Sequence, residues 1–127
     1  MALPLTVIDT TVVVDLLRGS AAAISWARGV DRGLVASEVT RVEIVRGLRS
    51  GERGSAERLF AGVRWVSVTE PIARRAGELG RQWRRSHGLL ALADLVIAAT
   101  AMELGAELAT ANVRHFPMFP DLEPPYR

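Results

Sequence analysis

Short β-prone runs alternate with segments of helical periodicity along this chain, and that alternation restricts the fold more than any other feature of the sequence. Strands that alternate with helices build a parallel sheet through right-handed crossovers, with helices on both faces. The predicted strands cover residues 5–8, 34–37, 63–68 and 107–110, and the proline-rich tail, 116–126, offers a further short strand at the sheet edge. The predicted helices cover residues 10–18, 21–28, 40–48, 55–60 and 92–104, with a long helix that opens at Glu70-Pro71. We therefore expect one α/β domain, residues 1–127, around a parallel sheet of four to five strands.

Open parallel sheets bind ligands beyond the carboxyl ends of their strands, so the residues just after each strand are the first candidates for a functional site. Asp9 follows the first predicted strand directly. Its carboxylate also suits the N-cap position of the helix that comes next. A capping role and a role in a site are both open for Asp9.

Glu43 lies near the start of the helix that follows the second predicted strand. Thr40 and Glu43 have the spacing of a capping box, in which Ser or Thr is followed three residues later by Glu. A capping box would use the Glu43 carboxylate locally, whereas a site at this edge of the sheet would use it together with Asp9. Either role places Glu43 at the sheet edge that Asp9 faces.

Asp94 is the only charged residue between Leu89 and Met102, and its apolar sequence neighbours predict deep burial. A buried carboxylate is costly unless it is paired, hydrogen-bonded or bound to a cation. An N-cap role is the local alternative for Asp94. A cation held by several carboxylates would offset the penalty and explain why acids follow several strands.

Asn112 follows the fourth predicted strand and is either a turn residue or an auxiliary of the site. His115, three residues later, would orient a phosphate or simply lie at the surface. Carboxylate and carboxamide oxygens together favour Mg²⁺ or Mn²⁺. Two widely separated histidines and no cysteine make a zinc site improbable. The sequence contains no glycine-rich phosphate loop, which argues against a nucleotide-dependent enzyme.

The charged residues favour a polyanionic partner only weakly. All 16 basic residues are arginines and the formal net charge is +2, and a GC-rich coding sequence explains the arginines as well. The arginines near Glu43 and along the long helix are either solvated residues with local ion pairs or contacts to RNA phosphates. The absence of cysteine and of a signal-like start at Met1–Leu5 leads us to expect a cytoplasmic protein.

Four motifs, in this order and spacing, resemble the PIN-domain family, and more narrowly the VapC-type toxins of bacterial toxin–antitoxin pairs. The motifs are Val7-Ile8-Asp9-Thr10-Thr11-Val12, Thr40-Arg41-Val42-Glu43-Ile44, Ala93-Asp94-Leu95-Val96-Ile97-Ala98-Ala99 and Thr110-Ala111-Asn112-Val113-Arg114-His115-Phe116. The resemblance implies a three-layer α/β/α sandwich, usually with five parallel strands. It also implies an endoribonuclease that depends on Mg²⁺ or Mn²⁺, forms homodimers and is held inactive by a small VapB antitoxin.

On the matching positions, the resemblance makes Asp9, Glu43 and Asp94 an acidic triad that binds the metal, with Asn112 where many relatives carry a fourth acid. Thr11 stands where the family often has Ser or Asn. Our hypothesis is that Asp9 and Asp94 hold the principal ion, while Glu43 completes the shell or acts as a base toward water.

Three alternatives remain. A PIN-like module that binds RNA or a partner without cutting keeps the fold and drops the activity. A receiver domain would need an Asp after the third strand and a Lys after the fifth, but the third strand ends in Val68-Thr69-Glu70 and the chain has no lysine. An ordinary α/β domain with capping acids and no metal site predicts that Mg²⁺ leaves the melting temperature unchanged.

Overall fold

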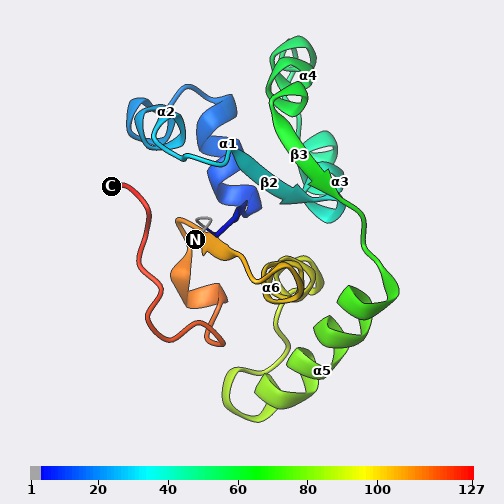
Figure 1. The fold of residues 1–127 in the computed structure, drawn as a ribbon. Coiled ribbons are helices and arrows are strands. Elements are labelled where there is room, and N and C mark those ends of the chain that lie inside the picture. Colours follow the sequence, from blue (N-terminus) through cyan, green and yellow to red (C-terminus); the bar gives the residue numbers. More distant parts are fainter. Residues whose placement is uncertain (1–3) are drawn as a thin grey trace.

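The computed structural model describes residues 4–127, and a parallel sheet of four strands lies at its centre (Figure 1). The strands are β1 (Thr6–Ile8), β2 (Leu34–Ser37), β3 (Val63–Val66) and β4 (Glu107–Ala109), in the order β3-β2-β1-β4. In the central strand, Val7 is in register with Val35 on one side and with Leu108 on the other. This confirms the predicted parallel sheet, with four strands.

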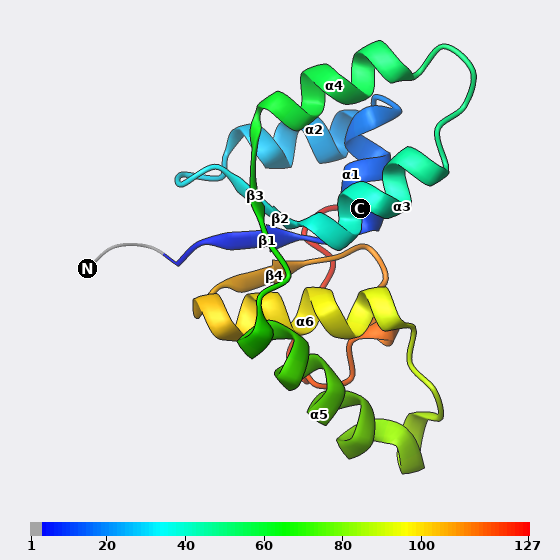
Figure 2. The ribbon, with the colours of Figure 1, turned by 90° about the vertical axis from the view of Figure 1, so that its right-hand side faces the viewer.

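Helices cover both faces of the sheet and complete the predicted three layers (Figure 2). On one face lie α1 (Thr10–Leu17), α2 (Ala21–Arg28), α3 (Glu38–Arg46) and α4 (Arg53–Ala61). On the other face lie α5 (Glu70–His87) and α6 (Leu92–Leu104). None of the helices within residues 4–127 is long and apolar enough to cross a membrane. Residues 1–3, which belong to the N-terminal stretch considered for a signal sequence, lie outside the described residues.

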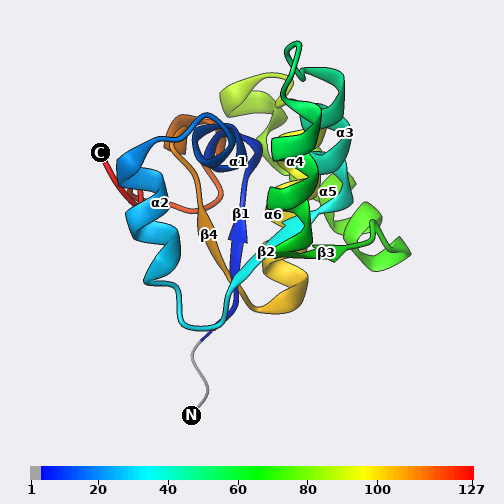
Figure 3. The same cartoon turned by 90° about the horizontal axis from the view of Figure 1, so that it is seen from above.

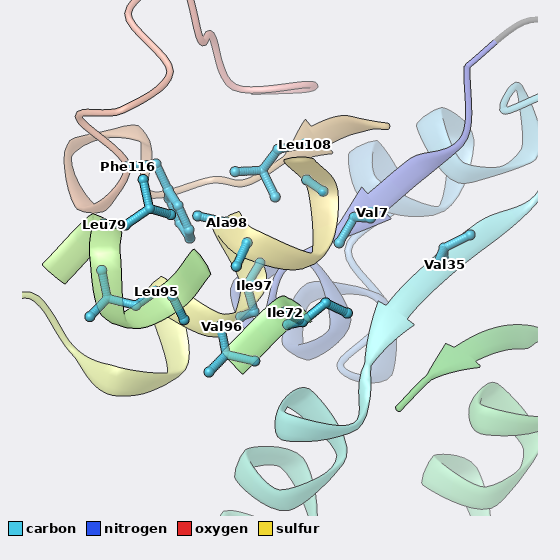
Figure 4. Packing of buried hydrophobic residues seen from close by; sticks show 13 residues of the cluster. Val7, Val35, Ile72, Leu79, Leu95, Val96, Ile97, Ala98, Leu108 and Phe116 are labelled. Carbon is cyan, nitrogen blue, oxygen red and sulfur yellow. The ribbon is translucent and has the colours of Figure 1, made fainter. Parts of the chain in front are cut away.

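Alternation along the strands divides the core into two hydrophobic clusters. Val7, Val35 and Leu108 point to the face covered by α5 and α6, where Ile97 of α6 is fully buried (Figure 4). Successive side chains of a strand point to opposite faces, so the next residue of each strand packs beneath the other helical layer. Those next residues are Ile8, Ala36 and Ala109. Residues 95–101 of α6 are all buried, because this part of the helix lies between the sheet and α5.

The C-terminal tail holds no strand within residues 110–127, so the prediction of an edge strand there is wrong. A short 3₁₀ helix, η1 (Val113–His115), follows β4 instead, and the chain then crosses the molecule toward α2 (Figure 1). Four prolines in this segment lack the N–H group that a strand needs. Phe116 anchors the start of the tail in the core at 1% exposure. Near its end, Tyr126 donates to Asp15 at 2.6 Å and stacks on Trp26.

Candidate active site

The predicted site residues follow the carboxyl ends of the strands, as the parallel sheet requires. Asp9 is the residue between β1 and α1, and Figure 3 shows β1 running into α1 between β2 and β4. Glu43 lies in α3, which follows β2, and Asn112 precedes η1 after β4. Asp94 lies at the same edge of the sheet, in the first turn of α6.

Asp9 is both a helix cap and a buried carboxylate. Its residue is only 3% exposed, and its Oδ1 accepts from the backbone N–H of Val12 at 3.2 Å, which confirms the capping role. The hydroxyls of Thr11 and Thr110 donate to Oδ1 and Oδ2, each at 2.6 Å. Burial raises the pKa of Asp9, and these hydrogen bonds oppose the shift. The ionised carboxylate is therefore held by neutral donors in a poorly solvated place.

The loop after β4 orients both hydroxyls that bind Asp9. The backbone N–H of Ala111 donates to Thr11 Oγ1 at 3.2 Å, and that of Asn112 donates to Thr110 Oγ1 at 2.9 Å. Each threonine hydroxyl thus accepts a hydrogen bond from the loop and donates one to the Asp9 carboxylate. Asp9 is positioned by α1 and by the β4–η1 loop together.

Glu43 does not form the expected capping box. Helix α3 begins at Glu38, and Ser37 is its N-cap, with Oγ accepting from the N–H of Val39 at 3.1 Å. Thr40 is therefore inside the helix and Glu43 lies in its second turn. The Glu43 carboxylate instead accepts from the hydroxyl of Thr10 at 2.5 Å, a contact between α3 and the first residue of α1. Glu43 is consequently available to the edge that holds Asp9.

Asp94 is half-buried, so the expectation of deep burial is wrong. Its side chain is 18% exposed, and its apolar sequence neighbours Leu89 and Leu92 are 86% and 75% exposed. The capping alternative is also wrong, since Ala91 occupies the N-cap position of α6. One carboxylate oxygen of Asp94 contacts His115 Nδ1 at 3.1 Å.

The electrostatics of Asp94 indicate that Asp9 and Glu43 lie near it. Burial is the main cause that raises the pKa of Asp94, and the negative charges of Asp9 and Glu43 raise it further. His115 lowers it by its charge and its hydrogen bond. Three carboxylates from three elements are thus close enough to repel one another.

Sequence reasoning identified the acids but missed most of their hydrogen-bond partners. Only the fold shows that Thr10 donates to Glu43 and that Thr11 and Thr110 donate to Asp9. The available hint was that a hydroxyl residue stands at the carboxyl end of β1 and again after β4. Asn112 is held at the same place, with Nδ2 3.0 Å from His115 Nε2.

The donor set fits a hard divalent cation. Carboxylate oxygens suit Mg²⁺ and Mn²⁺. Burial is the largest cause of the raised pKa of Asp94, and such an ion would neutralise the repulsion that adds to it. Across residues 4–127, no three acidic, cysteine or histidine side chains form a metal-coordinating group in this structure. The carboxylates share an edge of the sheet without forming a coordination shell there.

The comparisons with known proteins agree with this arrangement. The PIN domain family model matches residues 6–119. The chain is 50% identical over 122 residues to ribonuclease VapC19 of Mycobacterium tuberculosis, covering 94% of this chain and 98% of that protein. It is 45% identical over 121 residues to ribonuclease VapC10 of the same organism, covering 94% and 91%.

The fold is also found among solved structures. The DNA-bound VapBC structure from Salmonella typhimurium superposes with a TM-score of 0.81, covering 95% of this chain and 96% of that chain at 16% identity. At that identity the match shows the fold alone, while the range matched by the family model, residues 6–119, includes Asp9, Glu43 and Asp94. The chain belongs to the PIN domain family.

Proposed function

We propose that this chain is a VapC-type toxin, an endoribonuclease that hydrolyses RNA phosphodiester bonds with Mg²⁺ or Mn²⁺. The observation that carries the proposal is the gathering of Asp9, Glu43 and Asp94 at one sheet edge, where their charges interact. The 50% identity to a named ribonuclease over 94% of the chain supports the same activity.

The residues divide the work of the reaction as follows. Asp9 and Asp94 would hold the ion, and Glu43 would complete its shell or accept a proton from the attacking water. A bound divalent ion would activate water and neutralise charge on the phosphate. Asn112 orients a water or a phosphate oxygen from the β4–η1 loop. We expect products with a 5′-phosphate and a 3′-hydroxyl, as the family resemblance implies.

The partners that we propose are an RNA substrate, a VapB-like antitoxin and a second copy of the chain. The antitoxin is supported by structural neighbours that are a toxin–antitoxin complex from Klebsiella pneumoniae and VapBC from Salmonella typhimurium. A homodimer is an expectation from the family resemblance. Size-exclusion chromatography with light scattering on the purified chain tests it, and a monomer at micromolar concentration would contradict it.

Cleavage of a structured RNA under a Mn²⁺ titration tests the activity. We expect Asp9→Asn and Asp94→Asn to lose cleavage by at least about 100-fold, because each removes an anionic ligand of the ion. Asp31→Asn is the matched control, since Asp31 is an exposed carboxylate outside the described site. If either site variant cuts RNA as fast as the wild type, the assignment of that acid is wrong.

The same assay separates the enzyme from a silent PIN-like module. A silent module would bind RNA in a mobility-shift experiment, yet leave it intact at every concentration of Mg²⁺ and Mn²⁺. Mapping of the 5′ ends of the fragments identifies the scissile bond. Fragments that lack a 5′-phosphate would contradict hydrolysis by metal-activated water.

A further inference from the structure

His115 occupies a rigid position although its side chain is half-exposed. It is the last residue of η1, whose turn is closed by hydrogen bonds from His115 N to Asn112 O and from Phe116 N to Val113 O, both 3.0 Å. The next residue, Phe116, is buried in the cluster beneath α5 and α6 (Figure 4). The backbone that carries His115 is thus fixed from both sides.

The imidazole ring links the loop after β4 to α6. Asn112 Nδ2 lies 3.0 Å from Nε2 and 3.3 Å from Nδ1, while Asp94 Oδ2 lies 3.1 Å from Nδ1. An ionised carboxylate only accepts, so the ring proton that faces Asp94 is on Nδ1, and Nδ1–H donates to Oδ2. Asn112 Nδ2 is close to both ring nitrogens, so it packs against the ring. The imidazole therefore lies between Asn112 and Asp94.

The three acids of the site differ in what holds them. Asp9 accepts from two threonine hydroxyls and a backbone N–H, and Glu43 accepts from Thr10. The corresponding donor for Asp94 is His115, which comes from an element 21 residues away. The His115 contact joins Asp94 in the first turn of α6 to the end of η1, so it fixes the carboxylate from outside its own helix.

We propose that His115 is a positioning residue for Asp94, which donates from Nδ1 to Oδ2 and leaves Oδ1 to a divalent cation, while Asn112 holds the ring. The inference rests on the proposed function and deepens it by naming a residue that sets the affinity for the ion. Partners that orient ligand residues in this way alter metal affinity by about 10- to 100-fold when they are removed.

Mn²⁺ binding to the purified full chain, followed by titration calorimetry or electron paramagnetic resonance without RNA, tests the inference. We expect His115→Ala to weaken binding by about 10-fold. His115→Asn places an amide nitrogen where Nδ1 stood and should restore binding close to that of the wild type. His87→Ala is the matched control, because His87 is an exposed histidine at the end of α5 that contacts Ser86.

The variants distinguish positioning from other roles. Equal losses in His115→Ala and His115→Asn would mean that the ring itself binds the ion through Nε2 and would overturn the inference. Wild-type affinity in His115→Ala would overturn it as well. A wild-type protein that binds no Mn²⁺ would overturn the proposed function together with the inference. Urea denaturation without metal checks that His115→Ala is folded.

A double-mutant cycle tests the place of Asn112. If Asn112 acts through His115, the pair Asn112→Ala and His115→Ala should bind Mn²⁺ no more weakly than His115→Ala alone. Losses that multiply would show that Asn112 acts separately, which would overturn the statement that Asn112 holds the ring.

Discussion

The carboxylate of Asp9 caps α1, accepts two threonine hydroxyls and is almost completely buried. The cap stabilises the helix, whereas burial of the charge opposes folding. Since burial is the largest cause of its raised pKa, the ionised form is more stable in water than in the folded protein. Asp9 therefore places a functional charge at the expense of stability.

We expect Asp9→Asn to stabilise the metal-free protein at neutral pH by about 0.5–2 kcal/mol, because Asn keeps the cap acceptor and removes the buried charge. The raised pKa means that the folded protein binds this proton more tightly than the unfolded chain does. The contribution of Asp9 to stability therefore falls as pH rises from its ordinary pKa through the raised one. Urea denaturation of both proteins from about pH 4 to pH 7 measures the difference. A variant less stable than the wild type at pH 7 contradicts this prediction.

The positions of the acids were predictable from sequence, but their surroundings were not. The end of a parallel strand identifies Asp9, whereas Glu43 is identified mainly by the family pattern, because its helix also contains Glu38. The environment of Asp94 was misjudged because Leu89 and Leu92 are its neighbours in the chain and face solvent in the fold. Thr10 lies 33 residues from Glu43 in the chain, and Thr110 lies 101 residues from Asp9. No local sequence pattern therefore indicates these two donors.

Among the elements, helix ends were predicted well where one residue has a single role. The sequence places α6 at residues 92–104 with Gly105 as its cap, and the structure agrees, because Gly105 adopts a left-handed φ of 60°. The start of α3 was misplaced because Ser37 ends β2 and caps α3 at once, which leaves no loop between them. The tail was misjudged because the apolar Phe116 anchors a turn and not a strand.

Two glycine substitutions with opposite outcomes test this account of the helices. Gly105→Ala should destabilise the protein by about 1 kcal/mol, because a Cβ strains the left-handed backbone that ends α6. Gly77→Ala should stabilise it by about 0.5–1 kcal/mol, since Gly77 is exposed inside α5 and an added Cβ meets nothing within 4 Å. Thermal denaturation measures both. Equal shifts in the two variants would show that the backbone at Gly105 imposes no constraint.

For the whole molecule, the site joins segments that otherwise meet only through the core. Asp9 follows the central strand, Glu43 lies on one helical layer and Asp94 on the other. The charges of Asp9 and Glu43 oppose ionisation of Asp94, so the metal-free site carries an unfavourable electrostatic interaction between the two layers. An ion bound by all three would offset that interaction and tie both layers to β1.

We therefore expect Mn²⁺ or Mg²⁺ to raise the melting temperature of the whole protein. An ion at 100 times its dissociation constant stabilises the folded state by about 2.7 kcal/mol, which corresponds to on the order of 10 °C for a chain of this length. Asp94→Asn should remove most of the shift, because it removes one of the three ligands and its charge, whereas the exposed control Asp31→Asn should keep all of it. Differential scanning calorimetry with and without the metal measures these shifts. The same small shift in all three proteins would mean that the ion binds elsewhere, and the acids would then be capping and surface residues of an ordinary α/β domain.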